Sequence, residues 1–278
     1  MEILQPDTWR EALEMKGAEP EARPIAGGTD LMVELNFDRS RPSAILDLTR
    51  VPELTEWEME DGRLRIGAGV TYTRLIDELG DRLPGLALAS RTVGSPQIRN
   101  RGTIGGNLGT ASPAGDGLPP LYVADAEVEV ASVRGCRRLP VAEFVTGPKR
   151  NALAGDELIA AFVLPPADGP EQFAKVGTRN AMVIAVCSLA LRLSRGRVAV
   201  CVGSAGPTPL RARAAEEFAA GELRPGVRPS DSVLARFGQL VARAAQPIDD
   251  VRGTAAYRRH ALAVLARRTL LWAWEACA

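Results

Sequence analysis

Residues 103–116 read TIGGNLGTASPAGD, and a shorter segment at residues 24–31 reads PIAGGTDL. Each segment places two glycines side by side, so that backbone N–H groups can turn outward and a ligand can approach the main chain closely. Hydroxyl and carboxylate side chains flank both glycine pairs and can fix further polar groups. A tight turn would explain one such segment, whereas two of them predict a large, two-ended ligand that carries phosphate.

Composition alone leaves two interpretations open for each segment, a structural turn or a ligand-binding loop. The longer segment is polar and irregular, and such a stretch cannot enter a core unless its backbone groups find partners. This favours a ligand-binding loop for residues 103–116, whereas the shorter segment, taken alone, favours a turn over an anion site. We expect Asp30 to cap a helix or to pair with a hydroxyl, and Asp116 to accept a hydrogen bond from a sugar hydroxyl or a ring N–H.

Several common kinds of site are excluded by what the chain lacks. Neither glycine segment fits the phosphate-binding P-loop or the Rossmann dinucleotide fingerprint. The sole histidine, His260, is far from both segments in the sequence, which argues against a serine or cysteine triad and a multi-histidine metal site. The four cysteines are scattered without a C-x-x-C pair, so an iron–sulfur cluster in this chain is not expected. We therefore assign no catalytic or metal-binding residue, and any redox chemistry should belong to a bound cofactor.

Charge and hydropathy place further limits on function. Thirty-four basic residues balance thirty-four acidic ones, so nothing favours a nucleic acid as partner. Residues 1–6 do not combine a basic region with an apolar run, as a secretory signal would. The longest apolar run, residues 181–191, is too short to span a bilayer and is typical of a buried strand. The sequence predicts a cytoplasmic protein in a reducing environment.

The order of the expected elements predicts a mixed α/β chain. Residues 1–55 should form a small unit, residues 56–166 a second one, and the Pro- and Gly-rich stretch 165–171 the boundary before a third at 172–278. Expected strands lie at residues 23–26, 44–48, 57–59, 64–68, 126–133, 137–141, 157–164, 172–176, 183–193 and 197–202, and expected helices at 7–15, after residue 30, and at 72–83, 210–219, 230–245 and 254–276. Tight turns are expected at 61–62, 134–135 and 194–196.

The two glycine segments, taken with later stretches, resemble the FAD-binding (medium) subunit of the molybdenum hydroxylases, the family of bacterial xanthine dehydrogenase and the carbon monoxide dehydrogenase flavoprotein. Residues 25–31 and 103–116 are similar to its two flavin-phosphate motifs. Further similar segments are residues 156–159, 175–182, 207–211 and 250–258. The resemblance implies an α+β fold, in which a two-subdomain FAD-binding domain of the vanillyl-alcohol oxidase (PCMH) type at residues 1–166 precedes a C-terminal domain with a three-stranded antiparallel sheet and helices at 172–278.

The resemblance also implies which residues meet the cofactor. Residues 25–31 and 105–107 would hold the FAD pyrophosphate, and the attachment would be noncovalent because His260 lies outside both segments. The full implied set is Ile25, Ala26, Gly27, Gly28, Thr29, Asp30, Leu31, Thr103, Gly105, Gly106, Asn107, Thr110, Ser112, Asp116, Leu158, Ile159, Phe173 and Lys175.

The function implied by the family is an electron relay. A molybdenum-cofactor subunit would oxidise the substrate, [2Fe-2S] clusters in a second partner would carry the electrons to FAD here, and NAD⁺ or another acceptor would receive them. The assembly would be a heterotrimer able to dimerise, most similar to xanthine dehydrogenase. Two alternatives stay open from the residues: a non-catalytic nucleotide-binding or scaffold protein that keeps the fold, and a self-sufficient flavin oxidase.

Overall fold

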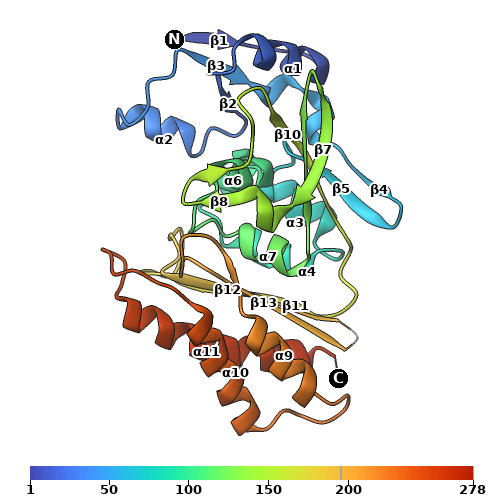
Figure 1. The fold of residues 1–278 in the computed structure, drawn as a ribbon, viewed down its shortest axis with the longest axis vertical. Coiled ribbons are helices and arrows are strands. Elements are labelled where there is room, and N and C mark those ends of the chain that lie inside the picture. The colour runs from blue at the N-terminus through green and yellow to red at the C-terminus, as the bar shows by residue number, and fades with distance from the viewer. Residues whose placement is uncertain (195, 278) are drawn as a thin grey trace.

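Three sheets of three or more strands follow one another along the long axis of the molecule, and the described residues also form one small two-stranded sheet (Figure 1). The structure is a computed structural model and describes residues 1–194 and 196–277. Each sheet carries helices, so the chain forms an N-terminal unit, a central unit and a C-terminal unit. The predicted α+β class is confirmed.

The N-terminal unit is a parallel three-stranded sheet in the order β1-β3-β2. Parallel neighbours need crossover connections, and the chain supplies helices for them. Its elements are β1 (Glu2–Leu4), α1 (Trp9–Ala18), β2 (Arg23–Ile25), α2 (Leu31–Asn36) and β3 (Ala44–Asp47), followed by two 3-10 turns at Leu48–Arg50 and Pro52–Thr55. Strand β1 was not expected from the sequence. Helix α1 begins at Trp9 because the Thr8 side chain accepts a hydrogen bond from the N–H of Glu11 and so caps the helix.

The central unit is built on an antiparallel five-stranded sheet in the order β4-β5-β10-β6-β7. Its strands are β4 (Trp57–Glu60), β5 (Arg63–Gly67), β6 (Glu127–Ser132), β7 (Gly135–Pro140) and β10 (Leu158–Leu164). The turn predicted at residues 61–62 is confirmed. Asp61 and Gly62 both have positive φ, which matches the turn to the twist of the flanking strands.

Helices and short strands cover one side of the central sheet. They are α3 (Tyr72–Leu79), α4 (Pro84–Arg91), α5 (Pro96–Arg101), α6 (Ile104–Thr110), α7 (Leu118–Val123), α8 (Val141–Phe144), β8 (Val145–Gly147) and β9 (Arg150–Asn151). The helix expected at residues 72–83 is shorter and ends at Leu79. Leu83 has non-helical backbone angles, and Pro84 after it begins a new helix, as proline favours the first helical position.

The longer glycine segment is not irregular throughout, which corrects the sequence-based expectation. Its first part forms helix α6, although glycine disfavours helix by about 1 kcal/mol per residue. Tertiary packing explains the difference, because the helix lies directly on the backbone of Ala68. A Cβ added at Gly105 would come within 2.4 Å of the Ala68 oxygen, so only glycine permits this approach.

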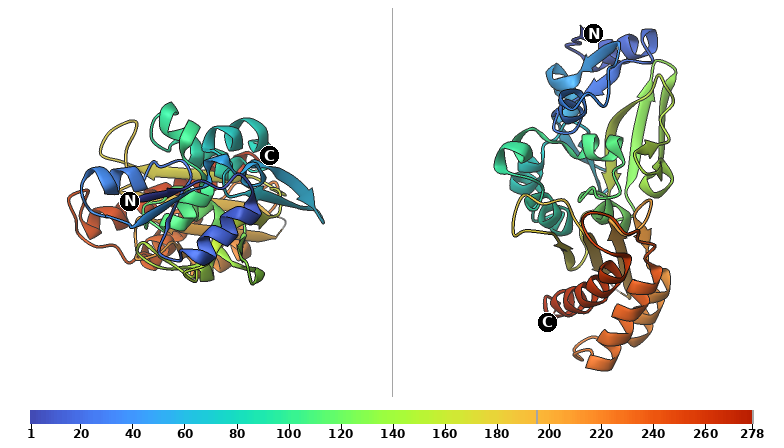
Figure 2. Two further views of the ribbon diagram at one scale, coloured as in Figure 1. Left: turned by 90° about the horizontal axis from the view of Figure 1, so that it is seen from above. Right: turned by 90° about the vertical axis from the view of Figure 1, so that its left-hand side faces the viewer.

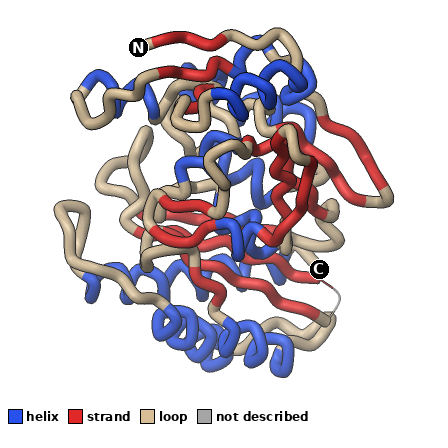
Figure 3. Tube along the Cα trace, turned by 45° about the horizontal axis from the view of Figure 1, so that its top comes forward, coloured by secondary structure: helices blue, strands red, loops and turns tan. Residues whose placement is uncertain are grey.

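The C-terminal unit is a sheet with helices on one face (Figures 2 and 3). Its elements are β11 (Glu171–Val176), β12 (Cys187–Ser194), β13 (Arg197–Gly203), β14 (Leu210–Arg211), α9 (Arg213–Glu222), α10 (Asp231–Ala244) and α11 (Ala255–Glu275). Along β12 the side chains alternate between the two faces: Leu189 and Leu191 pack into the helical core, and Ala190 packs against the central unit.

Three expectations for the C-terminal unit need correction. The sheet has four strands rather than three, because Leu210–Arg211 pair with β13 as β14. The helix expected from residue 210 therefore begins at Arg213. The strand expected over residues 183–193 begins at Cys187, because the residues before it form a loop. The turn expected at residues 194–196 involves Arg195, which lies outside the described residues.

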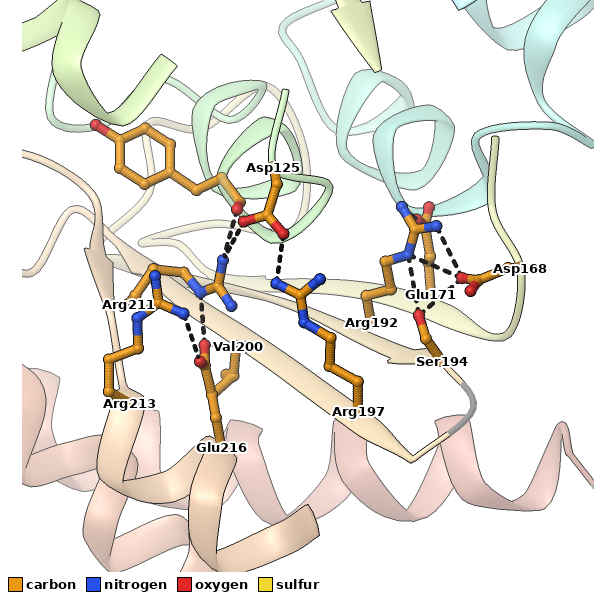
Figure 4. Close-up of polar contacts among 11 residues, drawn as sticks. Asp125, Asp168, Glu171, Arg192, Ser194, Arg197, Val200, Arg211, Arg213 and Glu216 are labelled. Carbon is orange, nitrogen blue, oxygen red and sulfur yellow. Dashed lines mark hydrogen bonds and ion pairs between the residues drawn. The ribbon is translucent and has the colours of Figure 1, made fainter. Parts of the chain in front are cut away.

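Ion pairs join the central and C-terminal units at two places (Figure 4). At the first, Asp125 follows α7 and binds two arginines of the C-terminal sheet, Arg197 at 2.5 Å and Arg211 at 3.0 Å. The Nε of Arg211 also pairs with Glu216 on α9 at 2.5 Å. Both side chains are less than one-tenth exposed, so Glu216 holds Arg211 from within the C-terminal unit while Arg211 reaches Asp125 across the interface.

The second junction is centred on the buried carboxylate of Glu171. Its Oε2 accepts a hydrogen bond from the N–H of Gly85 on α4 at 2.9 Å, and Nη1 of Arg192 lies 3.4 Å from its Oε1. Arg192 in turn donates to Asp168 in the segment that links the units (Figure 4). The two junctions hold the C-terminal sheet against helices α4 and α7.

Candidate functional site

The structure brings the two glycine segments into direct contact. A Cβ added at Gly27 would lie 1.9 Å from the carbonyl oxygen of Arg101 and 2.9 Å from the Cα of Gly102, so the first segment packs on the backbone that leads into α6. The hydroxyl of Thr110, at the end of α6, donates to Asp30 at 3.3 Å. The two segments therefore form one continuous surface, although about seventy-five residues separate them.

The first segment presents a row of backbone donors. Within residues 1–194 and 196–277, the N–H groups of residues 27–31 have no acceptor. Gly28 has a φ of 72°, a conformation that turns successive N–H groups toward one side and that glycine adopts without strain. Asp30 directly precedes α2 at the N-cap position, but its side chain makes no capping bond, so the pairing with a hydroxyl is the alternative that the structure shows. Unpartnered, half-buried donors of this kind suit an anionic ligand.

The second segment combines fixed and free polar groups. The Thr103 hydroxyl caps α6 by accepting from the N–H of Gly106 at 2.9 Å, and the Ser112 hydroxyl accepts from the N–H of Ala114 at 3.3 Å. Both hydroxyls therefore also hold the local backbone. Asn107 differs, because its Oδ1 is buried and has no hydrogen-bond partner in the described part of the chain. A Cβ added at Gly106 would meet only the Thr103 hydroxyl, at 3.1 Å, so this face of the helix is otherwise open.

Asp116 and Lys175 form a buried ion pair. The Lys175 ammonium lies 2.6 Å from Oδ2 of Asp116, and both side chains are less than one-tenth exposed. Oδ1 of Asp116 has no hydrogen-bond partner among the described residues. Burial raises the pKa of the Asp116 carboxyl above its usual range, and the charge and hydrogen bond of Lys175 oppose that rise. Two residues that were named separately from the sequence are thus one unit.

The remaining predicted residues lie in different surroundings. Ile159 is half-buried on β10 beside α6, where its Cδ1 lies 3.4 Å from a Cβ added at Gly109. Leu158 and Phe173 belong to hydrophobic cores, at 1% and 8% exposure. These two side chains pack within the protein, and the structure does not bring them to the surface formed by the glycine segments.

Sequence reasoning missed two residues that support this surface. Lys149 has a φ of 54°, and its backbone N–H donates to the oxygen of Ala111 while its ammonium pairs with Glu34 of α2 at 2.7 Å. Asn151 donates from its side chain to the oxygen of Gly109 at 2.7 Å. Both come from the β8–β9 hairpin, whose proximity to α6 has no local signal in the sequence. The Lys149 ammonium hydrogen bond lowers the pKa of the Glu34 carboxyl.

Other features of the described residues do not provide a competing centre. Two hollows, of 620 and 390 Å³, lie elsewhere on the molecule, and neither is lined by the glycine segments. Within residues 1–194 and 196–277, no group of three His, Cys, Asp or Glu side chains is placed to hold a metal ion. No helix in the same residues has both the length and the apolar character needed to cross a membrane.

Comparison with known proteins gives a consistent result over nearly the whole chain. A family model described as the FAD binding domain in molybdopterin dehydrogenase matches residues 1–167, and one described as the CO dehydrogenase flavoprotein C-terminal domain matches residues 172–273.

Individual relatives and structures agree with the family models. The putative xanthine dehydrogenase FAD-binding subunit XdhB of Escherichia coli K12 is 36% identical over 76% of each chain, and the nicotine 6-hydroxylase medium subunit of Paenarthrobacter nicotinovorans is 32% identical over 96% of this chain and 94% of its own. Carbon monoxide dehydrogenase from Hydrogenophaga pseudoflava superimposes with a TM-score of 0.90 at 27% identity, covering 100% of this chain and 98% of that one. Quinoline 2-oxidoreductase from Pseudomonas putida 86 superimposes with a TM-score of 0.93 at 25% identity, again covering 100% of this chain and 98% of that one. The chain therefore belongs to the FAD-binding subunits of the molybdenum hydroxylase family.

Proposed function

We propose that this chain is the electron-transfer flavoprotein of a molybdenum hydroxylase complex of the xanthine dehydrogenase type. A molybdenum-cofactor subunit would oxidise the substrate, and [2Fe-2S] clusters in a second partner would deliver electrons to FAD on this chain. NAD⁺ or another acceptor would then receive them. Relatives named as xanthine dehydrogenase and nicotinate dehydrogenase FAD subunits support this role. The assembly we propose is a cytoplasmic heterotrimer able to dimerise.

The observation that carries the proposal is the set of unsatisfied polar groups around the two glycine segments. The N–H groups of residues 27–31 and the buried Oδ1 atoms of Asn107 and Asp116 lack partners within the described residues. Buried polar groups in proteins are almost always paired, so this surface is built to receive something polar. The residues present therefore fit a dinucleotide, with donors for its phosphates and acceptors for its hydroxyl and ring N–H groups.

Each segment has a proposed task in holding FAD. Residues 25–31 and Gly105, Gly106 and Asn107 hold the pyrophosphate, and Thr103, Thr110 and Ser112 line the same surface. Asp116 accepts a hydrogen bond from a hydroxyl or ring group, and Ile159 offers apolar contact beside α6. Leu158, Phe173 and Lys175 support these residues from within the protein. Bound FAD supplies the redox-active ring, and we assign no catalytic residue to this chain.

We propose that FAD is bound noncovalently. The proposed domain boundaries follow the two family models. His260 is exposed on α11 in the C-terminal unit, so it does not reach the glycine segments. We assign residues 1–166 to the FAD-binding domain, with subdomains at about 1–55 and 56–166. Residues 172–278 form the C-terminal domain, which supplies Lys175.

An absorbance spectrum of the purified full chain tests the proposal. We expect flavin bands as isolated or after FAD is added and the excess removed by gel filtration. Absence of flavin bands after FAD is added would support the scaffold interpretation. Oxidation of substrate by the chain alone would instead indicate a self-sufficient oxidase. Purification with its neighbouring subunits, followed by substrate-dependent reduction of NAD⁺ or of an artificial acceptor, identifies the electron acceptor.

A further inference from the structure

The Lys175 ammonium joins three segments that are far apart in the sequence. It donates to the oxygen of Thr92 at 2.9 Å, to Oδ2 of Asp116 at 2.6 Å and to the oxygen of Val183 at 3.1 Å. Thr92 directly follows helix α4, Asp116 ends the second glycine segment, and Val183 lies in the loop between β11 and β12. A lysine ammonium has three N–H donors, so all of them are engaged with protein acceptors.

This saturation determines what the ion pair can offer a ligand. Lys175 has no N–H left for a cofactor, and its side chain is only 8% exposed. Asp116 has one oxygen held by the ammonium, while its other oxygen is buried and has no partner in residues 1–194 and 196–277. The acceptor presented to a ligand is therefore Oδ1 of Asp116, and Lys175 sets its direction.

The loop at residues 177–186 depends on the same ammonium. Its tip turns at Met182, which has a φ of 50° and accepts a hydrogen bond from Arg179. Met182 and Ile184 expose more than half of their surface. Near its C-terminal end the loop is fastened to the sheet through the N–H of Val186 and through the oxygen of Ala185, which accepts from the Ser204 hydroxyl at 2.8 Å. Lys175 adds the contact at Val183, closer to the middle of the loop.

We propose that Lys175 is a positioning residue that couples FAD binding to the order of residues 177–186. Its ammonium holds one oxygen of Asp116 and aims the other at a donor of the dinucleotide, and it ties the loop to the same point. The inference rests on the proposed function and extends it, because the C-terminal unit then controls cofactor affinity without touching the cofactor. Lys175 thus supports the FAD site instead of lining it.

Two single variants of the full chain separate the two contacts. Lys175→Met should weaken FAD binding by about 10- to 100-fold, because an unpaired Asp116 is left buried. It should also speed hydrogen exchange in residues 177–186 of the FAD-free protein. Asp116→Asn should weaken FAD binding as well but leave exchange in the loop unchanged, because Lys175 still reaches Val183.

The pH dependence of the FAD dissociation constant gives a readout that a purely structural role would not change. Without the ammonium, Asp116 should gain a proton at a higher pH. The loss of FAD affinity between about pH 8.5 and about pH 6 should therefore be larger for Lys175→Met than for the wild type, and Asp116→Asn should show no such loss. If Lys175→Met does not fold, the double variant Asp116→Asn/Lys175→Met removes both charges, and its affinity should be independent of pH with the loop still loosened.

Arg211→Met is the matched control, because it removes a cation of equal burial from the same interface but outside the glycine segments. It should lower thermal stability without making FAD affinity depend on pH. If the wild type does not bind FAD, the proposed function itself fails. If the wild type binds FAD and every Lys175 variant keeps its affinity, pH profile and loop exchange, the positioning role is refuted while the proposed function stands.

Discussion

Individual glycines in the two segments have different physical tasks, which the sequence does not distinguish. Gly27 and Gly105 allow one backbone to lie on another, since an added Cβ would come within 2.4 Å or less of a carbonyl oxygen. Gly106 has no such constraint, because its added Cβ meets only a hydroxyl. The first two positions are therefore required for folding, and the third faces the surface proposed to bind phosphate.

Gly106→Val tests this distinction. The branched side chain should fill space meant for the pyrophosphate and weaken FAD binding by at least about tenfold, while the melting temperature of the FAD-free protein changes little. Fluorescence titration with FAD and thermal unfolding measure the two effects. Gly221→Val, in the exposed part of α9 with nothing within 4 Å, is the control and should leave FAD affinity unchanged. Equal FAD affinity in the wild type and in Gly106→Val would contradict the placement of the pyrophosphate beside Gly106.

At the scale of elements, helix α6 shows how a short glycine-rich helix is maintained. Three of its seven residues are glycine, so its intrinsic helix propensity is poor. The Thr103 cap, the contact of Gly105 with Ala68 and the hydrogen bond from Asn151 compensate from outside the helix. The shape of the proposed phosphate surface thus depends on neighbouring elements.

Thr103→Val should remove the cap while keeping the shape of the side chain. We expect the free energy of unfolding to fall by about 0.5–2 kcal/mol, the usual cost of a lost N-cap, and FAD affinity to fall with it. Chemical denaturation and hydrogen exchange at the N–H of Gly106 measure the change. Thr103→Ser keeps the hydroxyl and should restore both values. If the N–H of Gly106 exchanges at the same rate in Thr103→Val as in the wild type, the cap is not needed to hold this helix.

At the scale of the whole molecule, the junctions between units contain buried charge of both signs. Glu171 is 5% exposed in its side chain, yet it anchors α4 through Gly85 and faces Arg192. Burial raises the pKa of the Glu171 carboxyl, and the Gly85 N–H and the Arg192 charge oppose the rise. Removing one member of such a pair leaves the other buried and uncompensated, so it should destabilise the interface.

Glu171→Gln gives a signed prediction for stability against pH. The folded-state pKa of Glu171 lies above its unfolded value, so the folded protein binds this proton first and gains stability as pH falls through that range. The free energy of unfolding of the wild type, minus that of Glu171→Gln, should therefore rise as pH decreases from about 7 toward 4.5. Denaturation at several pH values measures this difference.

Glu129→Gln is the control with the opposite sign. Burial acts to raise the pKa of Glu129, but hydrogen bonds from Arg65 and Arg138 lower it overall. The free energy of unfolding of the wild type, minus that of Glu129→Gln, should fall as the pH decreases below the ordinary pKa range of a glutamate, because the wild type then loses a favourable charge. If the stability difference changes with pH in the same direction for both variants, the raised pKa of Glu171 is contradicted.

Much of the fold could be predicted from the sequence because its signals are local. The strands expected at residues 57–59 and 64–68 correspond to β4 and β5, and Asp61-Gly62 indicated the hairpin between them. The helices expected from Ser230 and Thr254 start there, and the capping bonds of these two side chains confirm it. Such signals operate over a few residues, through dihedral preferences and side-chain bonds to nearby N–H groups. The two glycine motifs were also recognisable, and they indicated the family that the comparisons then showed.

Only tertiary structure decided how those pieces act together. That Lys175 lies against Asp116, 59 residues away, follows from the docking of the C-terminal sheet on α4 and α7. That residues 104–110 are helical, and that Leu158 and Phe173 belong to cores, follows equally from packing partners distant in the chain. A sequence specifies local conformation and burial tendency directly, whereas the neighbours of a buried polar group are set only when separate elements pack, because burial determines which hydrogen bonds must be made.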